Sequence, residues 1–173
     1  LRARMVSALT LLGADETPSS RGRWSYLDLV EALRRASATA QRDAHELFRR
    51  ACFNALISNT DDHLRNHAFL YEGQNGWRLS PAYDLNPVPT DIKPRVLTTA
   101  ITEDDTAASL DLVFKVAGYF EVTDERARTI AKEVAASASG WRAEAARQGI
   151  TRPHIERMAS AFEHKDMERA RSL

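Results

Sequence analysis

The sequence predicts a mainly α-helical fold with one small β-hairpin. Apolar residues recur at helical spacing through most of the chain, while two short strand-like segments flank a glycine-containing loop in its middle. The 173 residues, 43% of them hydrophobic, are enough to bury one core. We therefore expect a single domain over residues 1–173.

The first elements are expected to be helices. Residues 1–12 are apolar and are followed by Gly13 and by turn-forming residues over 15–22, which predicts a short helix and then a loop. Ser25 is placed to cap a second helix, because apolar residues recur at helical spacing over 26–33.

A longer helix is expected from about Ala40 to Ser58. Its apolar residues form one broad face, and its last turns are almost wholly apolar, as in a helix buried at the centre of a domain. The face comprises Ala44, Leu47, Phe48, Ala51, Cys52, Ala55 and Leu56. The helix leads directly into a polar segment, residues 59–66. These polar side chains should therefore emerge from a rigid support.

The hairpin is expected over residues 67–80. Strand-like segments 67–71 and 77–80 are separated by the loop 72–76, which contains two glycines. Asp84 follows soon after the second predicted strand. The hairpin thus separates the polar segment 59–66 from Asp84 by a short, defined connection.

Beyond the hairpin, an irregular segment and then three helices are expected. Prolines rule out continuous helix over 81–99, because each lacks an amide hydrogen and its ring clashes with the preceding turn. Helical patterns return over 106–120, 124–148 and 153–171. The candidate caps of the last two helices are Thr123 and Thr151.

The composition argues against several functional classes. Twenty-four basic residues balance 24 acidic ones, so the net charge does not favour nucleic acid or an anionic membrane as the main partner. No apolar stretch is long enough to span a bilayer. The single cysteine, Cys52, cannot form an internal disulfide and fits a reducing compartment. We expect a cytoplasmic protein.

The polar segment and Asp84 together have the chemistry of phosphoryl transfer. A kinase requires a carboxylate that orients the attacking hydroxyl, and oxygen ligands that hold magnesium on the nucleotide phosphates. Asp61, Asn66 and Asp84 supply these groups. The asparagine lies five residues after Asp61, and Asp84 comes after a short hairpin, as in protein kinases.

Residues 59–66 and 79–85 are similar to the signature of the HipA family of bacterial toxins, and the similarity extends over about 5–163. It implies the C-terminal lobe of a protein-kinase-like (HipA-like) α+β fold and an ATP-dependent serine/threonine protein kinase. It also implies a HipB-like helix-turn-helix antitoxin as partner, with operator DNA contacted only through the antitoxin. The implied substrate is an aminoacyl-tRNA synthetase, and the implied outcome is growth arrest and persistence.

The resemblance also implies roles for individual residues. Asp61 would be the catalytic base, and His63 and Arg65 would support catalysis. Asn66 and Asp84 would bind Mg²⁺ and, through it, ATP. Spacing alone assigns none of these roles.

Two parts of a complete kinase are missing from the chain. There is no G-x-G-x-x-G loop, and no lysine precedes Lys93, so none lies upstream of Asp61 to contact the nucleotide phosphates. Both features belong to an N-terminal nucleotide-binding lobe, which we expect to lie outside this chain. The chain alone should therefore transfer phosphate poorly or not at all.

Several alternatives remain open from the residues. The polar residues could form an ordinary capped turn, or a metal-dependent phosphohydrolase site in which His63 and His67 join the aspartates. A non-catalytic module that binds an antitoxin and assists repression is also possible, as is a lipid or small-molecule kinase. The other histidines are expected on helix surfaces: His45, His154 and His164. The pair Arg49–Arg50 could contact phosphate or lie on a solvated helix face.

Overall fold

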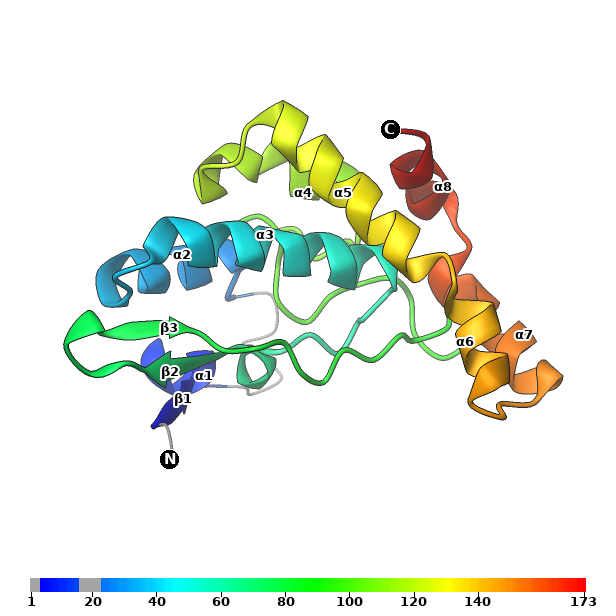
Figure 1. Cartoon of the computed structure of the whole chain (residues 1–173), viewed down its shortest axis with the longest axis horizontal. Coiled ribbons are helices and arrows are strands. Elements are labelled where there is room, and N and C mark those ends of the chain that lie inside the picture. Colours follow the sequence, from blue (N-terminus) through cyan, green and yellow to red (C-terminus); the bar gives the residue numbers. More distant parts are fainter. Residues whose placement is uncertain (1–3, 16–22) are drawn as a thin grey trace.

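The computed structural model describes residues 4–15 and 23–173, and its described part is mainly helical with a small antiparallel sheet (Figure 1). Helix α3 (Ala40–Leu56) runs through the middle of the molecule, with the sheet on one side and α5 (Asp124–Ala138) on the other. This arrangement confirms the predicted fold class. Among the described residues, none of the helices combines the length and hydropathy required to cross a lipid bilayer.

The predicted hairpin is confirmed. Strands β2 (Ala68–Tyr71) and β3 (Trp77–Leu79) pair antiparallel, and a single 3₁₀ turn, Gly73–Asn75, lies between them. Gly76 closes the loop with a φ of 73°, and the carbonyl oxygen of Ala36 would lie 2.5 Å from any added Cβ. Only glycine fits this position without strain.

The predicted helix over residues 1–12 is wrong in its first described part. Residues 5–7 form strand β1 (Met5–Ser7), which pairs antiparallel with β2 and makes the sheet three-stranded, in the order β1-β2-β3. Only α1 (Ala8–Leu11) is helical. A short, mainly apolar segment is compatible with either a helix or a strand. Here it forms a strand because it pairs with β2, some 60 residues later in the chain. Residues 16–22 of the predicted loop lie outside the described residues.

Helix α2 (Tyr26–Ala36) begins at the predicted cap. The Oγ of Ser25 accepts a hydrogen bond from the Asp28 amide at 3.4 Å, and the Asp28 carboxylate accepts one from the Ser25 amide at 2.8 Å. This reciprocal pair is a capping box. It fixes the start of α2 and therefore the position of Tyr26.

Helix α3 provides the core of the domain, as expected. Leu47, Phe48 and Cys52 are fully buried between α2, the sheet and α5. The helix ends at Leu56 rather than at the predicted Ser58, because Ser58 has a left-handed backbone with a φ of 54°. The chain leaves the helix at this residue.

The three predicted C-terminal helices are all interrupted. The observed elements are α4 (Leu110–Lys115), the 3₁₀ segment Ala117–Phe120, α5, α6 (Trp141–Arg147), α7 (Arg152–Phe162) and α8 (Lys165–Ser172). The first begins at Leu110 rather than 106, because Ala107 forms a β-bridge with Val96. The second breaks near Gly140, and the third ends at Glu163 before a new cap at His164.

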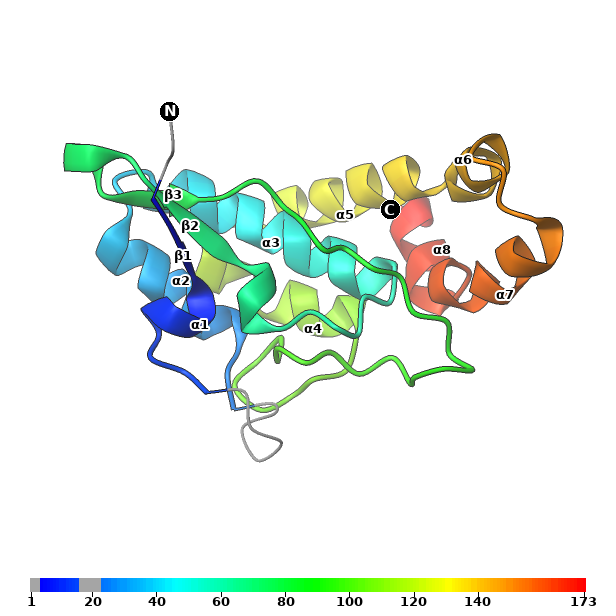
Figure 2. The same cartoon turned by 90° about the horizontal axis from the view of Figure 1, so that it is seen from below.

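The stretch between β3 and α4 is irregular, as the prolines predict. It contains no helix or named strand, and in Figure 2 it crosses in front of α3 before it returns toward α4. Its first part carries Asp84, and its later part returns to the segment that follows α3. This stretch therefore positions the candidate site.

Candidate active site

The turn after α3 is closed around the carbonyl oxygen of Asp61. That oxygen accepts the amide of His63 at 2.9 Å and the Nδ2 of Asn66 at 3.1 Å. Asn59 and Thr60 are fully buried at the base of the turn, whereas Asp61 is exposed. The backbone of Asp61 is thus fixed while its residue remains accessible to solvent.

Asn66 is positioned to use its side-chain oxygen. It is only 6% exposed, its amide donates to the His63 carbonyl at 2.8 Å, and its Nδ2 is committed to Asp61. The Oδ1 atom is left as an acceptor. The five-residue spacing found in the sequence therefore corresponds to a direct link between Asp61 and Asn66.

The segment that carries Asp84 is bonded to the same loop at two points. The hydroxyl of Tyr83 donates to the Arg65 carbonyl at 2.5 Å, and the amide of Val88 donates to the Ser58 carbonyl at 3.1 Å. The structure therefore brings Asp84 alongside the loop. Arg65 is exposed and contributes its carbonyl oxygen to this link.

The backbone of Asp84 is in an uncommon conformation. Its φ is 56°, in the left-handed region that non-glycine residues seldom adopt and that is frequent at functional sites. One carboxylate oxygen accepts from Asn86 Nδ2 at 2.5 Å, and the residue is exposed. Asn66 and Asp84 thus present hard oxygen atoms of the kind that Mg²⁺ prefers.

The later part of the irregular stretch supports the loop from behind. The Thr60 carbonyl accepts from Lys93 Nζ at 2.9 Å and from Thr98 Oγ1 at 3.0 Å. The Asp62 carbonyl accepts from the Thr99 amide at 3.0 Å. Carbonyl oxygens on both sides of Asp61 are therefore held by residues more than 30 positions away.

A buried polar network lies beneath the loop. The carboxylate of Asp62, 1% exposed, accepts from the Tyr26 hydroxyl and from His67 Nε2 at 2.9 Å. Asn54 Nδ2 donates to the Tyr26 oxygen at 2.9 Å, and Asn59 donates to Asn54 Oδ1 at 3.1 Å. Burial, followed by the nearby Asp62 charge, raises the pKa of Tyr26 well above its usual value. Tyr26 therefore stays protonated in the folded protein.

This network argues against the phosphohydrolase alternative. His67 is 2% exposed and its Nε2 is bonded to Asp62 in the core. Within residues 4–15 and 23–173, no three histidine, cysteine or acidic side chains are grouped so that they could hold a metal ion. His67 Nε2 is therefore already bonded within the core, whereas the hydrolase alternative needs this side chain as a metal ligand.

Removing the Tyr26 hydroxyl should destabilise the domain. Tyr26→Phe removes one hydrogen bond from each of the buried Asp62 and Asn54 side chains, which should cost about 1–3 kcal/mol. Because folding raises the Tyr26 pKa, the stability that Tyr26 contributes is present below about pH 10 and is lost as the pH rises further. Between pH 8 and pH 10.5, the free energy of unfolding measured with urea should therefore decrease less for the variant than for the parent protein.

The control for this measurement is Tyr71→Phe. Tyr71 is 40% exposed and keeps its ring contact with Trp77 as phenylalanine, so its stability should change by less than about 0.5 kcal/mol. Equal stabilities of the two variants at pH 8 would contradict the proposed importance of the network.

Arg95 connects the base of the loop to the C-terminal helices. Its guanidinium donates to the Ser58 Oγ at 3.1 Å, to the Ala55 carbonyl at 2.9 Å and to the buried Asp166 carboxylate at 3.0 Å. The Ser58 hydroxyl in turn donates to the Ala161 carbonyl at 2.9 Å. Helices α7 and α8 thereby fix the residue at which the chain turns out of α3.

His164 belongs to the same support, and its predicted place on a helix surface is wrong. Its Nδ1 accepts from the Met167 amide at 3.4 Å and so caps α8, while its Nε2 bonds to the Leu56 carbonyl at 3.0 Å. Burial lowers the pKa of His164, so its imidazole is favoured in the neutral form that makes both bonds. Its sequence position gave no signal of this contact with the end of α3.

The chain is similar to known proteins in sequence and in fold. The family model described as HipA-like C-terminal domain matches residues 1–141. Two Sinorhizobium fredii proteins named as candidate kinases are similar in sequence: Y4mE is 39% identical over 67 residues, and Y4dM is 45% identical over 47 residues. A structure of the Shewanella oneidensis toxin-antitoxin complex of HipA, HipB and operator DNA matches with a TM-score of 0.73 at 17% identity.

The chain is shorter than each of these relatives. The matched segments make up 39% of this chain and 16% of Y4mE, and 27% of this chain and 12% of Y4dM. All of the chain matches the Shewanella structure but spans only 46% of that protein chain. The likeness to the solved structure establishes the fold.

Proposed function

Because the chain belongs to the HipA-like C-terminal domain family, we propose that the complete protein is an ATP- and magnesium-dependent serine/threonine protein kinase and the toxin of a HipBA-type toxin-antitoxin pair. The observation that carries the proposal is the closed turn in which Asn66 Nδ2 bonds to the Asp61 carbonyl. The Tyr83 hydroxyl joins the Asp84 segment to that turn. These are three polar groups that phosphoryl transfer requires.

Asp61 is proposed as the base. It is exposed while its backbone is held, so a substrate hydroxyl can approach the carboxylate and donate its proton as it attacks in line. His63 and Arg65 are proposed to support the same step. Arg65 is exposed on the loop, where its guanidinium can offset negative charge on the transferred group.

Asn66 and Asp84 are proposed to hold Mg²⁺ on ATP. Protein sites usually bind this ion through one or two side chains plus the nucleotide phosphates, and two oxygen ligands without a larger acidic cluster fit that pattern. The bound ion would neutralise charge on the phosphates during transfer. The carboxylate of Asp84 and the Oδ1 of Asn66 would orient it.

The proposed partner is a HipB-like helix-turn-helix antitoxin, which would contact operator DNA itself. The Shewanella structure contains HipA together with HipB and operator DNA, and the equal numbers of basic and acidic residues here fit an indirect role at DNA. The proposed protein substrate is an aminoacyl-tRNA synthetase, whose phosphorylation would cause growth arrest and persistence. ATP and the single buried thiol of Cys52 fit a cytoplasmic site of action without a membrane partner.

Transfer of labelled γ-phosphate tests the proposal. The full-length gene product should phosphorylate protein in the presence of ATP and Mg²⁺, and EDTA should abolish the transfer. The 173-residue chain alone should be inactive, because it has no glycine-rich loop and no lysine before Lys93. Full-length protein that binds its antitoxin but transfers no phosphate would instead favour the non-catalytic antitoxin-binding module.

A further inference from the structure

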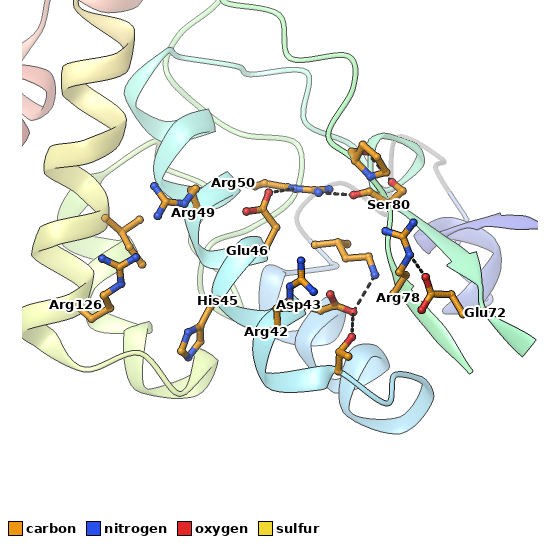
Figure 3. Close-up of a pocket in the computed structure, with 14 residues that line it drawn as sticks. Arg42, Asp43, His45, Glu46, Arg49, Arg50, Glu72, Arg78, Ser80 and Arg126 are labelled. Carbon is orange, nitrogen blue, oxygen red and sulfur yellow. Dashed lines mark hydrogen bonds and ion pairs between the residues drawn. The ribbon is translucent and has the colours of Figure 1, made fainter. Parts of the chain in front are cut away.

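A cavity of about 620 Å³ lies between α3, β3 and α5 (Figure 3). This volume is typical of sites that bind small molecules. The residues of the candidate active site do not line it: Asp61, His63, Arg65, Asn66 and Asp84. The cavity is therefore distinct from the proposed kinase site, and its chemistry can be considered separately.

The cavity wall is rich in arginine. Five arginines line it against three acidic residues, although the chain as a whole has no net charge. On the α5 side, Arg49 and Arg126 both bond to Glu133, at 2.6 and 3.0 Å. On the β3 side lie Arg42, Arg50 and Arg78 (Figure 3). Three acidic residues, Asp43, Glu46 and Glu72, line the same part of the wall, so an anionic ligand there would depend on contacts with individual guanidinium groups rather than on an excess of positive charge.

Arg50 forms the buried part of this wall. It is 5% exposed, its Nε bonds to Glu46 at 3.1 Å, and its Nη2 donates to the Ser80 carbonyl. Its Nη1 is buried and has no hydrogen-bond partner among the described residues. Arg50 is thus not on the solvated face that one interpretation of the sequence expected. A buried cationic N–H without an acceptor is unfavourable. Arg50 lines the cavity, so a shift of its guanidinium toward an anion bound there would give Nη1 an acceptor.

The two other arginines are available to a ligand. The side chain of Arg42 has no ion pair or hydrogen bond with any residue in the described part of the chain. Arg78 pairs with Glu72, but both side chains are 42% exposed, and such surface pairs exchange partners easily. The Asp43 carboxylate is directed to other groups: one of its oxygens accepts from the Leu79 amide and from two hydroxyl groups.

We propose that this cavity binds a small molecule with two or more phosphate groups, through Arg42, Arg50 and Arg78. Guanidinium groups bind phosphate with paired hydrogen bonds, and here α3 supplies Arg42 and Arg50 while β3 supplies Arg78. Arg50 also holds the carbonyl of Ser80, four residues before Asp84. A bound ligand would therefore contact the arginine that fixes the start of the Asp84 segment.

The test is calorimetric titration of the 173-residue chain with inorganic pyrophosphate at about 0.15 M salt, without Mg²⁺. Magnesium is omitted so that a metal-dependent nucleotide site does not contribute. Saturable binding is expected, and Arg42→Ala combined with Arg78→Ala should weaken it by about tenfold or more, because charge-assisted hydrogen bonds are lost. Both side chains are at the surface, so the variant should fold, which circular dichroism would verify.

A matched control is Arg147→Ala combined with Arg152→Ala. This variant also removes two positive charges, but it removes them from α6 and α7, at the other end of the molecule (Figure 1). Its affinity for pyrophosphate should stay within about twofold of the parent chain, because such distant charges are screened at this salt. The proposal is overturned if the parent chain does not bind pyrophosphate saturably, or if the two double variants weaken binding equally. Neither outcome depends on whether the full-length protein is a kinase.

Discussion

Asp61→Asn in the full-length protein is expected to reduce γ-phosphate transfer by about 10²–10⁴-fold. Asparagine has the same shape as aspartate but cannot accept the proton of the attacking hydroxyl. The hydrogen bonds that close the turn go to the backbone carbonyl of Asp61, so the substitution should leave the loop intact. The measurement is the initial rate of transfer at saturating ATP and Mg²⁺.

Asp104→Asn is the control for this change. Asp104 is exposed in a loop and contacts only Thr102, at 3.5 Å, among the hydrogen bonds of the described residues, so the rate should be unchanged. Antitoxin binding should survive both substitutions. An Asp61→Asn protein with the parental rate would exclude Asp61 as the base and would return the loop to a structural role.

Arg95→Met should destabilise the domain by about 3 kcal/mol. The substitution removes three hydrogen bonds and leaves Asp166, whose side chain is 7% exposed, as a buried carboxylate without its cation. Methionine has a similar length, so loss of packing should be small. In thermal unfolding of the 173-residue chain, the melting temperature should fall by about 10 °C.

Arg157→Met gives the comparison. Arg157 also pairs with an aspartate, Asp91, at 3.1 Å, but the two side chains are 57% and 55% exposed. Such a pair contributes less than about 1 kcal/mol. Similar melting temperatures for the two variants would show that the Arg95 contacts do not stabilise the fold.

The features that the sequence predicted correctly have local signals. The apolar face of α3, the Ser25 cap and the glycine-containing hairpin each depend on residues close together in the chain. The link between Asp61 and Asn66 also lies within one turn, so its spacing was visible in the sequence. Local geometry dictates these features, and a single sequence is enough to recognise them.

The features that the sequence did not predict depend on distant partners. Strand β1 exists because β2 pairs with it, and a segment of three residues contains no information about that partner. Arg95 and His164 look like ordinary polar residues until the fold brings them to the end of α3. The predicted long helices broke at Gly140, a residue of low helical propensity, and at His164, whose side chain bonds to the Leu56 carbonyl.

The family match ends at residue 141, but the contacts that support the candidate loop do not. A version truncated after that residue would keep Asp61, Asn66 and Asp84, yet it would remove Asp166, the acidic partner of Arg95. Every recognisable motif would be present in a protein whose Ser58 turn had lost the contacts that Ala161 and Asp166 supply. An expressed version of this chain should therefore include α7 and α8. A homologue whose C-terminal segment is unrelated needs other residues to hold the same turn.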